Sequence, residues 1–289
     1  MKTIWLCLSL LLLVPAFLFN QTNELDRAQQ HIYAKQYKEA KTVLQNYLDS
    51  GTSAQGRYML SKVHYVLEEI DAAIDNAKAA VNLDEKNAEY HYWLGVCYGA
   101  QTNSASVIKQ PFLAKKTQKA FLQAVTLDST HFSARTALAQ YYLRAPGIMG
   151  GDINKAYEHV RILMKQDEVE GRILLAQVYQ RDNKDELADK EYAELEEKIG
   201  DNPDYYYFFN SYGYYLLNKG ETDLAIRKFR KQVELAPDNP NAHDSLGEGL
   251  LKKGLLKESL AEYQRALELD PGLKSAKVKV EEIESRLND

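Results

Sequence analysis

The sequence predicts an all-α protein, an α-solenoid of about seven helical hairpins followed by a C-terminal capping helix. Ala, Leu, Glu, Lys and Gln, which favour helices, dominate the 289 residues, and only 7 prolines and 15 glycines are present. Segments that alternate like strands are scarce. A pattern of small and bulky side chains also recurs every 34 residues, a period typical of stacked helix pairs.

The repeat is clearest in the two segments that precede residue 274. Its six positions are occupied by Gly213, Leu216, Ala225, Phe229, Gln232 and Pro237 in one copy and by Gly247, Leu250, Ser259, Tyr263, Ala266 and Pro271 in the next. Within each helix the apolar positions lie three or four residues apart and therefore share one face. A single hairpin cannot bury that face, so neighbouring hairpins are expected to stack.

Seven copies of the pattern are predicted between residues 21 and 273. Two of them are stretched, by residues around Gln101–Lys116 and within Ala145–Gly151. We interpret both inserts mainly as structural, with a partner contact through Pro111-Phe112-Leu113 as the alternative. The approximate bounds of the copies are 21–54, 54–87, 88–131, 132–168, 169–202, 206–239 and 240–273.

The ends of the chain differ from the repeats. Ala276, Val280, Ile283 and Leu287 form one apolar stripe, which predicts a capping helix over residues 274–289. Asp270-Pro271 is interpreted as a helix start. At the other end, the apolar run of residues 4–19 follows a basic residue, so residues 1–20 are predicted to be a signal peptide or an N-terminal membrane anchor, with a core helix as the third alternative.

Composition and motifs argue against several functional classes. The formal net charge is −5, which disfavours nucleic acid as the main partner. No GxSxG, GxGxxG, phosphate-loop or HExxH motif occurs, and no CxxC pair is present. His31 and His64 occupy the same repeat position, which favours packing over ligation. We therefore expect no catalytic residues, no metal site and no cofactor.

The repeat pattern resembles the tetratricopeptide-repeat family over nearly all of the chain after the N-terminal run. The stretches His91–Gly95 and Ala139–Gly151 resemble exported bacterial members and, distantly, the eukaryotic regulators of microtubule dynamics. The resemblance implies a protein-binding scaffold that holds a peptide in a concave groove, located in the bacterial periplasm, secreted, or tethered to the inner membrane by residues 4–19. The family's carboxylate clamp is not matched, because its positions hold Tyr58, Lys62, Tyr92, Val96, Thr136 and Gln140.

A groove-lining set follows from projecting the repeat template, in which the first helix of each pair lines the inner surface. Such tyrosine, amide and arginine side chains suit a wet binding surface, and they predict an extended peptide with an acidic middle. The alternative is a solvated helix face. The predicted partner-binding residues are Tyr58, Lys62, Tyr65, Tyr92, Gln140, Arg144, Gln177, Arg181, Asn210, Tyr214, Asp244 and Glu248.

The densest aromatic segment, residues 205–215, is expected to pack mainly in the core. Tyr207 and Tyr214 are seven residues apart, which suggests a shared stacking platform. The functional prediction is a scaffold of the cell envelope that binds a protein or peptide, with membrane contact only through an uncleaved N-terminal segment. The alternative function is a structural or assembly factor that associates with itself.

Overall fold

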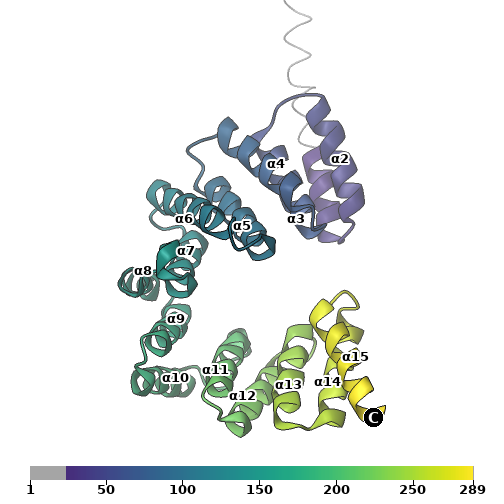
Figure 1. Ribbon diagram of the computed structural model, residues 1–289. Helices are drawn as coiled ribbons and strands as arrows, with labels where there is room; N and C mark the ends of the chain where they lie inside the picture. The colour runs from purple at the N-terminus through teal and green to yellow at the C-terminus, as the bar shows by residue number, and fades with distance from the viewer. Residues whose placement is uncertain (1–23, 289) are drawn as a thin grey trace, which may run out of the picture. The chain divides into compact units, whose positions relative to one another are not determined.

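A computed structural model describes residues 24–288, and the predicted signal or anchor over residues 1–20 lies outside this range. The described residues form helices joined by short turns and contain no strand, which confirms the all-α prediction (Figure 1). The described residues divide into two compact units, one up to residue 163 and one from residue 164.

The first unit contains helical hairpins in chain order. Its helices cover residues 24–33 and then α2 (Tyr37–Asp49), α3 (Ala54–Val66), α4 (Ile70–Leu83), α5 (Ala88–Ser104), α6 (Gln110–Leu127), α7 (Phe132–Arg144), the 3-10 turn η1 (Gly147–Met149) and α8 (Ile153–Gln166), whose last residues belong to the second unit.

The second unit continues the same arrangement. It contains α9 (Glu168–Arg181), α10 (Asp185–Ile199), the 3-10 turn η2 (Pro203–Tyr205), α11 (Tyr206–Asn218), α12 (Thr222–Leu235), α13 (Pro240–Lys253), α14 (Leu256–Leu269) and α15 (Lys274–Asn288).

Side-chain caps mark the start of several first helices. The Ser53 hydroxyl accepts a hydrogen bond from Gly56 N at 3.0 Å, and Asn87 caps α5 in the same way. Asn239 caps α13, with Pro240 in the first turn. The expectation that Asp270-Pro271 begins a helix is wrong. Asp270 ends α14, and α15 starts only at Lys274, because the Asp270 side chain caps a turn by accepting from Gly272 N.

Close helix approach occurs where the repeat pattern places a small residue opposite a ring. A Cβ added to Gly213 would lie 2.4 Å from the Phe229 ring, and one on Gly247 would lie 3.1 Å from Tyr263. The stretched copy keeps this contact, since a Cβ on Gly95 would lie 2.5 Å from Phe121. The recurring small residue is therefore needed for helix contact inside a hairpin.

A serine hydroxyl also forms a hydrogen bond across this interface, and the serine lies on the first helix in one repeat and on the second helix in another. In one hairpin Ser61 Oγ donates to the Ala73 carbonyl at 2.7 Å. In the last hairpin the serine is on the other helix, and Ser259 Oγ donates to the Gly247 carbonyl at 2.7 Å. Both serines are fully buried, and these bonds satisfy their hydroxyl groups.

The two inserts have different structures. The longer one extends both α5 and α6, so only residues 105–109 connect them. Leu113 packs against the core beside Tyr98, whereas Phe112 is 73% exposed. The shorter insert forms η1 and a turn at Gly150, and a Cβ on Gly151 would lie 1.8 Å from the Ala145 carbonyl oxygen, so only glycine fits there.

The last helix covers the final hairpin as predicted. Ala276 and Ile283 are fully buried against Tyr263 and Ala266, and Val280 is half-buried. Leu287, the fourth residue of the predicted stripe, is 39% exposed.

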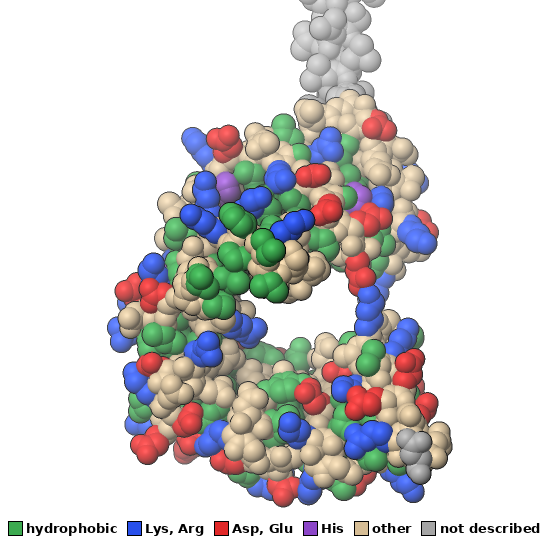
Figure 2. Space-filling view, viewed as in Figure 1, with side chains coloured by type: hydrophobic (Ala, Val, Ile, Leu, Met, Phe, Trp, Pro, Cys, Tyr) green, Lys and Arg blue, Asp and Glu red, His purple; other side chains and the backbone are tan. Residues whose placement is uncertain are grey.

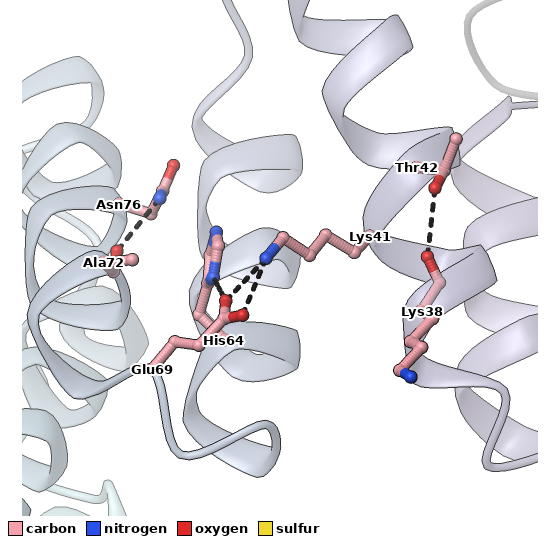
Figure 3. A network of polar contacts seen from close by, with 7 residues as sticks. All are labelled: Lys38, Lys41, Thr42, His64, Glu69, Ala72 and Asn76. Atoms are coloured by element: carbon pink, nitrogen blue, oxygen red, sulfur yellow. Dashed lines mark hydrogen bonds and ion pairs between the residues drawn. The ribbon is translucent and has the colours of Figure 1, made fainter.

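Polar contacts also join successive helices in the first unit. Figure 3 shows Glu69 between Lys41 of α2 and His64 of α3, with the Lys41 Nζ–Glu69 Oε1 distance at 2.8 Å. Hydrogen bonds from Lys41 and then from His64 lower the pKa of Glu69. His31 makes the corresponding bond one repeat earlier, to Gln36 at 2.7 Å, which supports a structural role for both histidines.

Candidate functional site

In the first unit, four predicted groove residues lie on α3 and α5, and a tryptophan joins them. Lys62 Nζ lies 5.2 Å from the centre of the Tyr58 ring and 5.6 Å from that of Trp93. Tyr65 packs edge-on against Trp93 at 5.2 Å. Figure 2 shows hydrophobic side chains gathered over this part of the molecule, with basic side chains among them. The arrangement combines aromatic area with one cation.

Glu89 is the acidic member of this surface. It accepts a hydrogen bond from the Tyr58 hydroxyl at 2.6 Å, and its other oxygen lies 3.1 Å from His131 Nε2. Burial, followed by the bond to Glu89, raises the pKa of Tyr58. Tyr92 is half-buried and packs against Phe121 and His131, with ring centres 6.0 and 5.3 Å away. Tyr92 therefore lies beside the Tyr58–Trp93 contact and does not join it by a ring contact.

The predicted residues on α7 and α9 form fewer side-chain interactions. Gln140 and Gln177 are half-buried, and Arg144 and Arg181 are exposed. No hydrogen bond or ion pair joins any of these four side chains to another residue between 24 and 288. Arg144 and Arg181 are thus basic groups without a carboxylate partner among the described residues.

In the second unit, four predicted residues lie on α11 and α13. Tyr214 donates to Glu248 at 2.8 Å, and its hydroxyl lies 3.4 Å from Ser245 Oγ. Ser245 donates to the Asn210 side-chain oxygen at 2.8 Å. These contacts connect residues about one repeat apart, so the polar face continues from one hairpin to the next.

Asp244 completes this face and lies one helical turn before Glu248. It accepts a hydrogen bond from Ser275 at 3.0 Å. Burial, and then the neighbouring Glu248, raises the pKa of Asp244. No ion pair involves either carboxylate among residues 24–288. The two carboxylates are therefore available to a cationic group.

The aromatic segment packs mainly in the core, as expected. Phe208, Phe209 and Tyr215 are buried, and Tyr212 stacks on Tyr192 of α10 at 4.7 Å. The predicted Tyr207–Tyr214 platform is wrong. Tyr207 contacts the rings of its neighbours Tyr205 and Tyr206, whereas Tyr214 packs against Phe229 at 5.1 Å.

Reasoning from the repeat template missed three contributors to these faces. Trp93 was not among the predicted groove residues, but its indole N–H donates to Ser61 Oγ at 2.8 Å while its ring stays in contact with Lys62. Glu89 and Ser245 are both within one turn of predicted residues. Glu89 lies in the first turn of α5 and Ser245 in the middle of α13, and these positions on first helices were the signal that could have identified them.

Among residues 24–288, no cluster of His, Cys, Asp and Glu side chains is arranged to hold a metal ion. None of the helices there combines the length and hydropathy that a bilayer crossing needs.

Known proteins that are similar to this chain also contain helical repeats. A family model described as tetratricopeptide repeat matches residues 58–105 and 212–274. The mouse (Mus musculus) Superkiller complex protein 3 is 26% identical over 223 residues, which cover 75% of this chain. The chain spans only 13% of that protein's length.

Solved structures share the fold at low sequence identity. A tetratricopeptide repeat protein from Parabacteroides merdae aligns with a TM-score of 0.67 and 10% identity, covering 91% of this chain and 98% of that one. The C-terminal part of a repeat-containing protein from Cytophaga hutchinsonii aligns with a TM-score of 0.51 and 15% identity, covering 89% and 99%. Residues 58–105 and 212–274 therefore carry tetratricopeptide repeats, and the helical hairpins and glycine–ring contacts of the described residues agree with that fold.

Proposed function

We propose that this protein is a protein-interaction scaffold that holds an extended segment of a partner along its first-helix faces. The observation that carries the proposal is the polar bonding between consecutive first helices, above all Tyr214 with Glu248 and Tyr58 with Glu89. These bonds hold aromatic and polar side chains in place before a partner arrives, which reduces the entropy lost on binding.

The charges on these faces favour particular partner side chains. Asp244 and Glu248 lack a cationic partner among the described residues, so this part of the face suits a lysine or arginine of the bound segment. Arg144 in the first unit and Arg181 in the second are exposed, and each suits an acidic residue of a bound segment.

We also propose that the scaffold works in the bacterial cell envelope. The apolar run of residues 4–19 supports export or tethering to the inner membrane. Fractionation of the producing cells, followed by N-terminal sequencing of the recovered chain, tests this part. Recovery from the cytosol with residues 1–20 intact would rule it out.

Site-specific cross-linking tests the binding face directly. A photo-reactive benzoylphenylalanine replaces Asn210 or Tyr65 in the full chain, and cross-linked products are identified by mass spectrometry. The matched control carries the probe at Glu197, an exposed residue of the second helix α10. We expect one product from both face positions and none from the control. Equal products from all three positions, or none, would contradict the proposal.

Self-association is the alternative that the sequence leaves open. Light scattering of the full chain in solution, measured over a range of concentrations, separates the two functions. A monomer disfavours self-assembly, whereas a mass that grows with concentration together with cross-links only between copies would favour it.

A further inference from the structure

The turn between α5 and α6 carries exposed apolar side chains that the repeat fold does not require. Val107, Ile108 and Phe112 are 77%, 83% and 73% exposed. They follow one another on the turn and the first residues of α6, where Leu113 is the neighbour that packs inward. Large side chains exposed together in this way commonly mark a contact surface.

The same surface is basic, although the whole chain is acidic. Residues 90–127 contain four lysines and no aspartate or glutamate, in a chain with 41 acidic and 36 basic residues. The lysines are Lys109, Lys115, Lys116 and Lys119, and all four are exposed. Phe112, Lys115 and Lys119 lie three and four residues apart, so they share the outer face of α6.

These lysines also lack the ion pairs that lysines elsewhere in the fold form. Lys228 pairs with Glu196, and Lys219 pairs with Asp189 at 2.8 Å, each joining neighbouring hairpins. Between residues 24 and 288, no carboxylate forms an ion pair with any of the four α5–α6 lysines. Lys116 Nζ lies 5.4 Å from the centre of the Tyr98 ring.

We propose that this turn is a docking surface for an anionic lipid bilayer. Val107, Ile108 and Phe112 enter the boundary between headgroups and acyl chains, and the unpaired lysines contact lipid phosphates. The chemistry favours lipid over a protein partner because the apolar side chains protrude from a turn, and a protruding apolar tip surrounded by lysines matches the layering of an anionic membrane surface. The proposal is independent of residues 4–19 and of the partner-binding faces.

A fluorophore attached to the turn of the full chain reports whether the turn lies in water or in lipid. Val107→Cys carries the fluorophore NBD in a Cys7→Ser background, and Cys97 stays unlabelled because it is fully buried. Phosphatidylglycerol vesicles are expected to shift the emission to the blue and increase it, whereas phosphatidylcholine vesicles leave it unchanged. The matched probe is Val278→Cys on α15, another exposed valine, which is expected to remain in water with both.

Charge reversal then tests the role of the lysines. Each lysine at an anionic surface strengthens partitioning about fivefold, so Lys115→Glu with Lys119→Glu is expected to raise the lipid concentration for half-saturation of the probe by about 25-fold or more. Lys252→Glu with Lys257→Glu makes the same change in net charge at exposed lysines of the second unit and is expected to have little effect.

Three outcomes would overturn the proposal. In the first, the probe at residue 107 stays in water although the chain binds vesicles, which would assign binding to another segment. The probe responds equally to both lipids, which would remove the role of charge. The chain does not bind anionic vesicles at all, which would leave the turn for an acidic protein partner.

Discussion

The Tyr214 hydroxyl donates a 2.8 Å hydrogen bond to Glu248, which lies 34 residues later in the chain. The two residues occupy the same position in successive repeats, on the first helices α11 and α13. The bond therefore joins one hairpin to the next on the face that we assign to partner binding, and it is the first target for mutation.

Tyr214→Phe removes this bond and keeps the ring contact with Phe229. We expect the free energy of unfolding to fall by about 1 kcal/mol, since one hydrogen bond to a charged acceptor is lost from a half-buried site. Urea unfolding measures the change. Tyr206→Phe is the control, because no hydrogen bond to the Tyr206 hydroxyl is found among residues 24–288, and it is expected to be nearly neutral.

Tyr214→Ala combined with Arg181→Ala is expected to weaken partner capture without changing the helical circular dichroism. Both side chains lie on first helices. Arg181→Ala removes an exposed cation, whereas Tyr214→Ala removes the hydroxyl that faces Glu248 together with a ring contact to Phe229. Quantitative pull-down of the cross-linked partner measures the effect. Glu197→Ala with Lys257→Ala, on second helices, should retain capture. Unaltered capture by the first pair would exclude this face.

Gly247→Leu is expected to destabilise the last hairpin by about 1–3 kcal/mol through overpacking. Even a single added Cβ would lie 3.1 Å from the Tyr263 ring, and the leucine side chain reaches further. Thermal unfolding followed by circular dichroism measures the loss. Gly147→Ala is the control, since an added Cβ there meets no atom within 4 Å. Equal melting of wild type and Gly247→Leu would contradict the assigned contact.

Stability of the first unit is expected to decrease as the pH falls below about 6.5, the ordinary pKa of histidine. Burial, and then Arg135, lowers the pKa of His159, which stacks on Tyr142 at 5.5 Å. Because the folded pKa lies below the unfolded one, the unfolded chain binds more protons there, so this stability is complete above the unfolded pKa and is lost in acid.

His159→Gln isolates this effect, because it keeps a hydrogen-bond acceptor for Arg135 but does not titrate. Melting temperatures at pH 8 and pH 5 are compared for both chains. We expect a smaller decrease in the variant than in the wild type. Identical decreases would show that carboxylates alone cause the acid sensitivity.

The helical fold and its register were predictable because the repeat pattern records direct contacts. The spacing that separates Gly213 from Phe229 also separates Gly247 from Tyr263, and in both cases the glycine meets the ring. The stretched copy was aligned correctly as well, since Gly95 meets Phe121 despite the insert. Small and bulky residues are thus reliable signals where two helices touch.

Other features depended on contacts that spacing alone does not describe. Tyr207 and Tyr214 are two turns apart, yet Tyr207 sits in the first turn and packs against its own neighbours. Trp93 follows the packing period, but its indole reaches a serine in the preceding repeat. Helical periodicity predicts which face a side chain occupies, and not how far across that face it extends.

The lengthened α5–α6 hairpin shows that the solenoid accepts extra residues at a hairpin turn. The Gly95–Phe121 contact is kept, so the added length lies at the turn end of α5 and α6 and does not disturb the contact between the two helices. The equivalent turn between α9 and α10, at Asn183, is therefore a suitable place to insert a fluorescent reporter for following the protein in living cells.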